Sequence, residues 1–274
     1  MVKVIATDLD GTLFKPRKIY SLVEKSNKKF LKNFYGDVVL VSGRAPNFCA
    51  KICNCLKIDH NFVALNGAII VKNGKIIYKQ SLKNTALLNL IDFMDENYSN
   101  YEIILFDKYD DITCYTNKNK FKWHLKTLKN KFKNGRLNEK IKLSNKKVKK
   151  LLNRNIFIYK AILYPNDGIE DIATILKEKF GEHFEFFPSN FSIEISPKGI
   201  HKGNSLKYLI DTTNISYDEV FVIGDGTNDI AMIETFPNSF AINTGSNKLK
   251  VKAKHIVNKV SDLEQYTKMN GNFK

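Results

Sequence analysis

Short runs of apolar, β-forming residues alternate with segments of helical spacing along the first third of the chain. The run VKVIATD ends at Asp8, DVVLVSG covers 37–43 and FVAL covers 62–65. Such short, unbroken apolar runs predict parallel strands that are buried on both faces. The residues between them, at 21–35 and 46–57, have the spacing of helices. This order predicts an α/β fold built on a doubly wound, Rossmann-like parallel sheet.

The pattern changes near residue 81 and returns after Pro197. Between these points, helices and strands that pair locally indicate a separate α+β layer. The helices are expected at 84–97 and 168–180, and the strands at 101–107, 111–116, 155–164 and 184–196. We therefore expect a core domain of residues 1–80 plus 195–274, interrupted by an inserted α+β domain of residues 81–194.

The basic residues of the chain are concentrated in one segment. The formal net charge is +16, and residues 118–154 hold 15 lysine or arginine residues against the single acid Glu139. Aromatic residues among lysines can stack on nucleic-acid bases. Here, however, Phe121, Leu125, Leu128 and Phe132 have helical spacing, which predicts a helix with one buried and one solvated basic face. Nucleic acid is therefore not the expected partner.

Targeting and redox signals favour a cytoplasmic protein. No stretch approaches the roughly 20 apolar residues that a membrane span needs, and the start MVKVIATDLDGT lacks the features of a signal peptide. Four cysteines are too few for a disulfide framework in a chain of this length, so we expect reduced thiols. No membrane association is expected, and the sequence leaves the oligomeric state open.

Four short polar segments fall where the predicted strands end or where a predicted helix begins. In an open α/β sheet, ligands bind at the carboxyl ends of the strands. The segments are Asp8-Leu9-Asp10-Gly11-Thr12, Ser42-Gly43-Arg44, Lys202-Gly203 and Gly224-Asp225-Gly226-Thr227-Asn228-Asp229.

Brought together, these side chains suit the transfer of a phosphoryl group. Asp8 can attack phosphorus and form an acyl-phosphate. Asp8 and Asp225 are the natural pair of ligands for Mg²⁺, which would offset the repulsion between carboxylate and phosphate. Lys202 and Ser42 would supply positive charge and a hydrogen-bond donor to the phosphate oxygens. Asp10 is left to protonate the leaving alkoxide and then to deprotonate the attacking water.

These segments resemble the four motifs of the haloacid dehalogenase superfamily, in order and in spacing. The motifs are DLDGT, the serine of VLVSGR, the lysine of HKG, and GDGTND. An insertion between the second and third motifs, NGA at 66–68 and IEISPKG at 193–199 resemble the Cof-type subgroup of sugar-phosphate phosphatases, in which the inserted domain is a cap. The resemblance covers essentially the whole chain. His201 departs from it, because aspartate or serine is common at that position.

The resemblance implies a Mg²⁺-dependent phosphatase, a phosphoric monoester hydrolase that acts on small phosphomonoesters through an aspartyl-phosphate on Asp8. Asp10 would be the acid and base. The implied metal site comprises Asp8, Asp225, the backbone carbonyl of Asp10, and Asp229 as a supporting residue. The candidate phosphate or substrate contacts are Ser42, Gly43, Arg44, Asn66, Lys202 and Asn228.

Several alternatives stay open at this point. A phosphohexomutase could use the same nucleophile and return the phosphoryl group to the sugar, and a polyanion-binding protein could use the basic segment 118–154. That segment could instead favour substrates with a second anionic group, or it could contact only solvent. Asn66 could begin a hairpin turn or face the substrate, and Arg44 could reach a substrate anion or an acidic side chain of the protein.

Overall fold

The protein, described by a computed structural model, divides into two compact units. The first is Met1–Lys79 with Ile200–Lys274, which we call the core, and the second is Gln80–Gly199, which we call the cap. The residues that the structure describes are 1–14, 23–98, 100–106, 112–116, 141–143, 145–154, 156–166 and 168–269.

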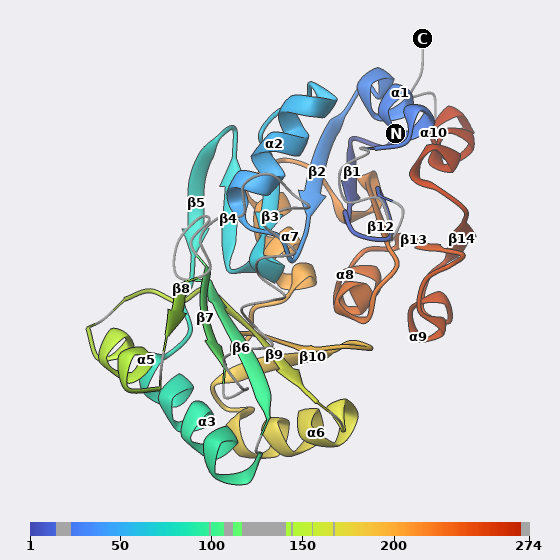
Figure 1. Cartoon of the computed structure of the whole chain (residues 1–274). Helices are drawn as coiled ribbons and strands as arrows, with labels where there is room; N and C mark the ends of the chain where they lie inside the picture. The colour runs from blue at the N-terminus through green and yellow to red at the C-terminus, as the bar shows by residue number, and fades with distance from the viewer. Residues whose placement is uncertain are drawn as a thin grey trace. The chain divides into compact units, whose positions relative to one another are not determined.

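The core is built on an eight-stranded sheet in the order β14-β13-β12-β1-β2-β3-β4-β5 (Figure 1). The six strands from β14 to β3 run parallel, and β4 and β5 form an antiparallel hairpin at one edge. This confirms the predicted α/β class. The strands are β1 (Val4–Thr7), β2 (Asp37–Val41), β3 (Phe62–Ala64), β4 (Ile69–Lys72), β5 (Lys75–Lys79), β12 (Val220–Gly224), β13 (Asn238–Ile242) and β14 (His255–Val257).

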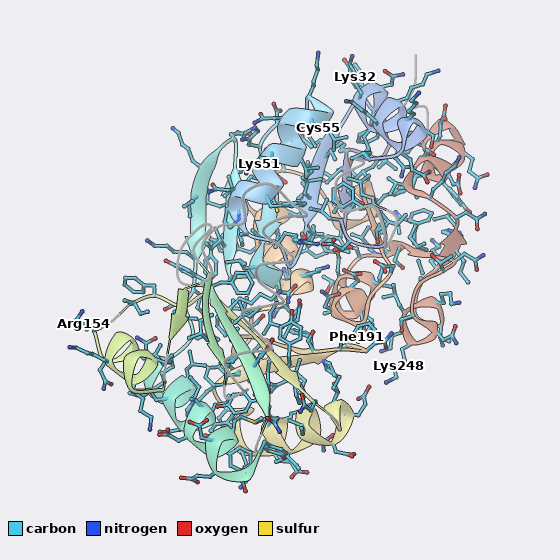
Figure 2. The ribbon with its side chains drawn as sticks, viewed as in Figure 1. Lys32, Lys51, Cys55, Arg154, Phe191 and Lys248 are labelled. Carbon is cyan, nitrogen blue, oxygen red and sulfur yellow. The ribbon has the colours of Figure 1, made fainter. Side chains whose placement is uncertain are left out.

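Helices cover both faces of the core sheet, so the central strands are buried on both sides. Val4 and Ala6 of β1 share a cluster with Leu206 and Met232 on one face, whereas α2 lies on the other face (Figure 1). Lys32 and Lys51 project outward from α1 and α2 (Figure 2). The helices are α1 (Lys25–Asn33), α2 (Pro46–Leu56), α7 (Lys202–Asp211), α8 (Ile230–Thr235), α9 (Asn247–Lys250) and α10 (Glu264–Met269).

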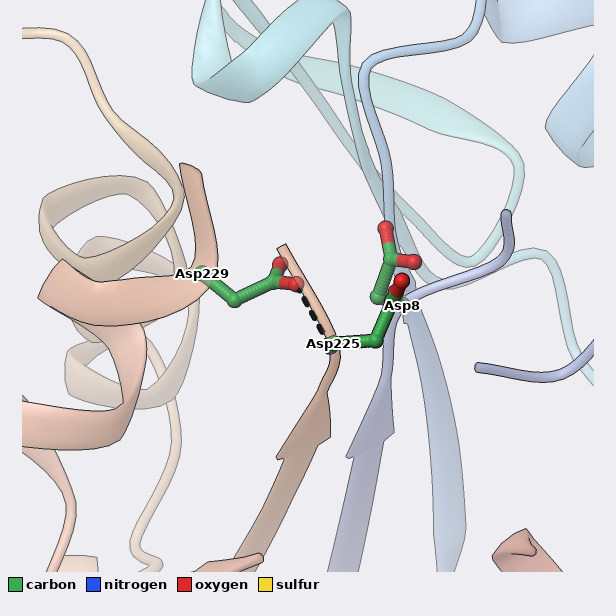
Figure 3. A group of neighbouring side chains, drawn as sticks. All are labelled: Asp8, Asp225 and Asp229. Carbon is green, nitrogen blue, oxygen red and sulfur yellow. Dashed lines mark hydrogen bonds between the residues drawn. The ribbon is translucent and has the colours of Figure 1, made fainter. Parts of the chain in front are cut away.

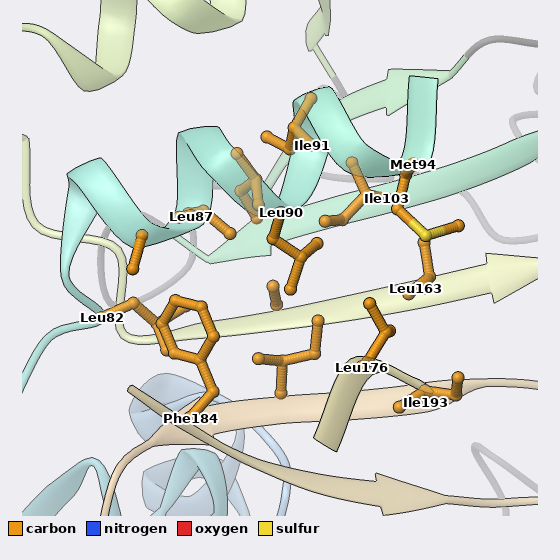
Figure 4. Close-up of a cluster of buried hydrophobic side chains, with 14 of the residues drawn as sticks. Leu82, Leu87, Leu90, Ile91, Met94, Ile103, Leu163, Leu176, Phe184 and Ile193 are labelled. Atoms are coloured by element: carbon orange, nitrogen blue, oxygen red, sulfur yellow. The ribbon is translucent and has the colours of Figure 1, made fainter. Parts of the chain in front are cut away.

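The cap has its own sheet and its own hydrophobic core. Its six strands follow the order β10-β11-β9-β6-β7-β8, and all pairs are antiparallel except β7 with β8. Leu87 and Leu90 of α3 pack with Ile103 and Leu163 of the sheet and Leu176 of α6 (Figure 4). The elements are α3 (Asn84–Asn97), β6 (Tyr101–Phe106), β7 (Ile112–Thr116), β8 (Ile141–Leu143), α5 (Asn145–Leu152), β9 (Lys160–Pro165), α6 (Ile169–Phe180), β10 (Phe184–Pro188) and β11 (Ile193–Pro197).

Three expectations about the cap need comment. Of the strand predicted at 155–164, the structure shows Lys160–Pro165, and the Ile158 carbonyl before it accepts a hydrogen bond from the Leu82 N–H instead of from a strand. The strand β8 and the helix α5 lie within the basic segment and were not predicted, while the helix predicted around 121–132 lies outside the described residues. The boundary expected between the inserted domain and the core, at 194/195, falls inside β11. All of β11 belongs to the cap, because the strand pairs along its length with β10.

Candidate active site

The predicted segments lie at the carboxyl ends of neighbouring core strands. Asp8 follows β1, Ser42 follows β2, Asp225 follows β12, and Lys202 is the first residue of α7. Because β1 pairs in parallel with both β2 and β12, the carboxyl ends of these three strands lie side by side, and we call this end of the sheet its carboxyl edge. The fold therefore gathers side chains that are up to about 217 positions apart in the sequence.

A buried lysine joins two of the aspartates. Lys202 Nζ donates to Asp8 Oδ1 and to Asp229 Oδ1, both at 2.6 Å, and its side chain is 1% exposed. The lysine is fixed at the start of α7, where His201 Nδ1 accepts a hydrogen bond from the Asn204 N–H and caps the helix. His201 thus performs the capping that a serine or aspartate provides in many helices, so this departure from the family pattern preserves the position of Lys202.

The third aspartate is positioned by the turn after β1. Thr12 Oγ1 donates to Asp225 Oδ1 at 2.8 Å. Gly11 has a φ of +90°, and a Cβ placed on it would lie 2.1 Å from Asp225 Oδ2. Glycine is therefore required both for the left-handed backbone and for the close approach of the carboxylate. The backbone of Asp225 is held as well, because Asp229 Oδ2 accepts hydrogen bonds from the backbone N–H groups of Asp225 and Gly226.

Burial and mutual repulsion set the charges of these groups. Burial raises the pKa of Asp8 well above its usual range, although the ammonium of Lys202 opposes the shift. Burial and the neighbouring Asp229 raise the pKa of Asp225 to about 6. Burial disfavours the charged form of Lys202, but Asp229 and Asp8 outweigh this effect and raise its pKa above the usual range. An ionised cluster of three carboxylates and one ammonium carries two net negative charges.

This cluster fits a divalent cation. One carboxylate oxygen from each of Asp8, Asp225 and Asp229 lies within 4.8 Å of the others. Figure 3 shows the carboxylates of Asp8 and Asp225 next to each other beyond the ends of β1 and β12. Carboxylate oxygens are hard ligands, which Mg²⁺ prefers. A doubly charged ion would also balance the two net negative charges and relieve the repulsion that, together with burial as the larger cause, raises the pKa of Asp8 and of Asp225.

Asp10 and Arg44 form a separate ion pair at the same edge. Arg44 Nε donates to Asp10 Oδ2 at 2.7 Å, and Arg44 Nη2 donates to Asp10 Oδ1 at 2.6 Å. Of the two partners considered for Arg44 from the sequence, the structure therefore shows an acidic side chain of the protein. That acid is the residue expected to act as acid and base.

The phosphate-binding candidates are held by the loop Leu65–Gly67. Ser42 is buried, and its Oγ accepts a hydrogen bond from the Arg44 N–H at 3.1 Å across Gly43. The Asn66 N–H donates to the Ser42 carbonyl at 3.0 Å, and Asn66 Oδ1 accepts from Asn228 Nδ2 at 3.4 Å. Asn66 therefore belongs to the turn before β4 and also contacts a candidate phosphate-binding residue.

Sequence reasoning assigned no role to several supporting residues. Thr12 holds Asp225, and Ser205 of α7 donates from Oγ to the Gly67 carbonyl at 3.1 Å. Thr12 lies inside the DLDGT motif, so its position offered a signal. Ser205 offered none, because a serine three residues after Lys202 has no distinguishing pattern.

The comparisons with known proteins identify the family of the chain. The family of haloacid dehalogenase-like hydrolases matches residues 5–264. The protein 5-amino-6-(5-phospho-D-ribitylamino)uracil phosphatase YbjI of Escherichia coli is 26% identical over 265 residues, which is 93% of this chain and 90% of that protein.

Solved structures show the same fold. The subclass IIB sugar phosphatase BT4131 superposes with a TM-score of 0.77 at 17% identity, over 99% of this chain and 100% of that chain. A HAD/COF-like hydrolase structure from Plasmodium vivax superposes with a TM-score of 0.78 at 22% identity, over 98% and 96% of the two chains. At these identities the likeness establishes the fold alone.

The chain belongs to the haloacid dehalogenase-like hydrolases. Its architecture, a mostly parallel core sheet and a separate cap sheet, is that of the Cof-like and subclass IIB structures. Among the described residues, no helix is long and apolar enough to cross a membrane.

Proposed function

We propose that the protein is a Mg²⁺-dependent hydrolase of small phosphomonoesters, such as sugar phosphates, and that it acts through an aspartyl-phosphate on Asp8. The observation that carries the proposal is the buried ion pair of Lys202 with Asp8 and Asp229, beside Asp225. A buried carboxylate that faces one ammonium and lies next to a candidate cation site is arranged to receive a dianionic phosphate.

The first step is displacement at phosphorus. Lys202 engages Oδ1 of Asp8, so we assign the attack to Oδ2. The bond from Asp8 to phosphorus forms as the bond from phosphorus to the leaving oxygen breaks, and Asp10 gives its proton to that oxygen. The products of this step are the free alcohol and the phosphorylated Asp8.

The second step hydrolyses the acyl-phosphate. Asp10, now a carboxylate, takes a proton from water, and the water oxygen bonds to phosphorus as the bond to Asp8 breaks. Inorganic phosphate is released and both aspartates regain their starting states. One residue can therefore act first as acid and then as base, because the first step leaves it in the form that the second step needs.

In this proposal, Mg²⁺ would be held by Asp8, Asp225 and the backbone carbonyl of Asp10. When bound, the ion supplies positive charge that offsets the repulsion between Asp8 and the phosphate. Asp229 supports the site indirectly, since its two oxygens already accept from Lys202 and from the backbone of Asp225 and Gly226. It orients Lys202 and fixes the loop that carries Asp225.

The remaining contacts to phosphate are assigned from their positions. Ser42 Oγ and the backbone N–H of Gly43 follow β2 at the same edge as Asp8, and Lys202 provides the positive charge. Asn228 is linked to them through Asn66, since Asn228 Nδ2 donates to Asn66 Oδ1 at 3.4 Å and the Asn66 N–H donates to the Ser42 carbonyl. Hydrogen-bond donors placed in a buried site stabilise the charge of the phosphoryl group during transfer.

The proposal includes a cytoplasmic location and a small phosphorylated metabolite as the partner. Cys49, Cys53 and Cys55 are free thiols, as expected in a reducing compartment.

The test is phosphate release from a panel of sugar and nucleotide phosphates, with Mg²⁺ or with EDTA. We expect release that requires Mg²⁺ and is lost in Asp8→Asn. Product analysis with a hexose 1-phosphate distinguishes a phosphatase from a phosphohexomutase, because a mutase would yield the hexose 6-phosphate and little free phosphate. Activity that persists in Asp8→Asn would contradict the proposal.

A further inference from the structure

Arg44 presents a complete binding surface for an anion. Its Nε and Nη2 groups donate in parallel to the two oxygens of Asp10, at 2.7 and 2.6 Å. The planar guanidinium matches carboxylate and phosphate groups in this two-point arrangement, and a lysine cannot reproduce it. In the substrate-free protein the anion that fills this surface is Asp10.

The guanidinium lies over the ring of Phe48, which itself packs against Phe14. Arg44 Cζ lies 5.0 Å from the centre of the Phe48 ring, and Phe14 packs edge-on against Phe48 at 6.2 Å between ring centres. The backbone of Arg44 is fixed as well, by its N–H bond to Ser42 Oγ and by its carbonyl, which accepts from the Leu65 N–H. Arg44 therefore stays beside the candidate phosphate site whether or not Asp10 is bound to it.

The Arg44–Asp10 pair is exposed enough to open. The side chains of Arg44 and Asp10 are 39% and 50% exposed, in contrast to the buried pair of Lys202 with Asp8. Exposed ion pairs typically contribute about 0–1 kcal/mol, and a two-point arginine–carboxylate pair such as this one is the favourable case. An anion delivered to Arg44 by a bound substrate can therefore replace Asp10 with little loss of protein stability.

We propose that Arg44 binds a second anionic group of the substrate, a carboxylate or a second phosphate, and that Asp10 occupies this place when no substrate is bound. The inference rests on the proposed function, because it takes Asp8 as the reacting residue and Asp10 as the proton donor. It assigns a substrate class, phosphomonoesters that carry a further anion near the leaving oxygen.

The exchange has a consequence for turnover as well as for binding. While Arg44 donates to both oxygens of Asp10, it favours the ionised form of this carboxyl group and holds its side chain in place, so Asp10 is less available as a proton donor. A second substrate anion that takes Arg44 releases the Asp10 carboxylate. Asp10 then takes up a proton from solvent, as the loss of the guanidinium favours, and can give it to the leaving oxygen. The anion should therefore raise kcat in addition to lowering KM.

The test compares 3-phosphoglycerate with glycerol 3-phosphate, which differ by a carboxylate in place of a hydroxymethyl group. We expect wild-type kcat/KM to favour 3-phosphoglycerate at least about tenfold, which is about 1.4 kcal/mol. In Arg44→Met the ratio of kcat/KM values should fall to near one, because the loss on 3-phosphoglycerate is larger than any change on glycerol 3-phosphate. The ratio of kcat/KM values for Arg44→Lys should lie between those of the wild type and Arg44→Met, because this variant keeps the charge and loses the two-point geometry.

Lys32→Met is the matched control. Lys32 is an exposed cation on α1 of the same unit (Figure 2), and its loss changes the net charge by the same amount. We expect the wild-type ratio to persist in this variant. A merely structural role of Arg44 would lower kcat for both substrates together, and this outcome would overturn the inference.

A binding measurement covers the case in which neither ester is turned over. Calorimetry of Asp8→Asn with Mg²⁺ should show at least tenfold tighter binding of 3-phosphoglycerate, and Asp8→Asn with Arg44→Met should lose that preference. Equal affinities, or a preference that survives the loss of Arg44, overturn the inference and leave the phosphatase proposal intact. The phosphatase proposal itself fails if the wider panel shows no Mg²⁺-dependent release, or if release persists in Asp8→Asn.

Discussion

Lys202 Nζ lies 2.6 Å from Asp8 Oδ1, although the two residues are 194 positions apart in the sequence. Both side chains are buried, at 1% and 6% exposure. The pair therefore joins the start of α7 to the end of β1 and holds the proposed nucleophile in place.

Removing the lysine leaves two buried carboxylates without their cation. We expect Lys202→Met to lose activity and to destabilise the metal-free protein by about 3–5 kcal/mol at pH 7. The double variant Lys202→Met with Asp8→Asn should recover part of that stability, because the carboxylate charge of Asp8 is then removed together with the ammonium of Lys202. It should recover none of the activity. Urea unfolding of the wild type and of these two variants measures the difference, and equal stability of wild type and Lys202→Met would refute the structural role of the pair.

Mg²⁺ should stabilise the protein more as the pH rises through about 6. In the unfolded chain, Asp225 loses its proton near the ordinary value of 3.8, whereas in the folded protein it does so near 6. The metal-free fold therefore loses stability as the pH rises from about 4 through 6, since the unfolded state ionises first. Mg²⁺ binds the ionised carboxylates and offsets this loss.

The measurement is the Mg²⁺-induced shift in Tm at pH 5 and at pH 7. We expect a small shift at pH 5, a larger one at pH 7, and a loss of this pH dependence in Asp225→Asn. Identical shifts at the two pH values in the wild type would argue against Asp225 as a ligand.

Gly11→Ala should damage the site more than the fold. The new Cβ would lie 2.1 Å from Asp225 Oδ2 and would displace that carboxylate, while the φ of +90° adds backbone strain of about 1–3 kcal/mol. Gly168→Ala is the matched control, because Gly168 has a φ of +69° and nothing within 4 Å of the added Cβ. Both variants should lose stability, and Gly11→Ala alone should lose Mg²⁺-dependent activity. Equal activities of the two variants would show that the close approach to Asp225 is unimportant.

The convergence of Asp8, Ser42 and Asp225 could be predicted because each follows a buried strand. An unbroken apolar run such as VKVIATD indicates a parallel strand covered on both faces, and parallel strands end at one edge. The side chains after those strands must then lie near one another, whatever the intervening cap contains.

The Arg44–Asp10 pair could not be predicted in this way. The sequence placed both residues at the correct end of the strands. The anion that the long arginine side chain reaches depends on how that side chain packs against Phe48 and on how Phe48 packs against Phe14. No residue spacing in the sequence encodes these contacts. The strand β8 was missed for a different reason, since its three residues Ile141–Leu143 are too few to show a period.

The most direct test of the account is to find the phosphoryl group on Asp8. Asp10→Asn should slow hydrolysis of the acyl-phosphate, so a rapid acid quench of this variant with an aryl phosphate, whose leaving group needs no proton, should trap the intermediate. We predict that mass spectrometry will show one added phosphoryl group, located on Asp8, formed with Mg²⁺ and absent with EDTA. Phosphate release by the wild type with no phosphorylated Asp8 in either protein would contradict the account.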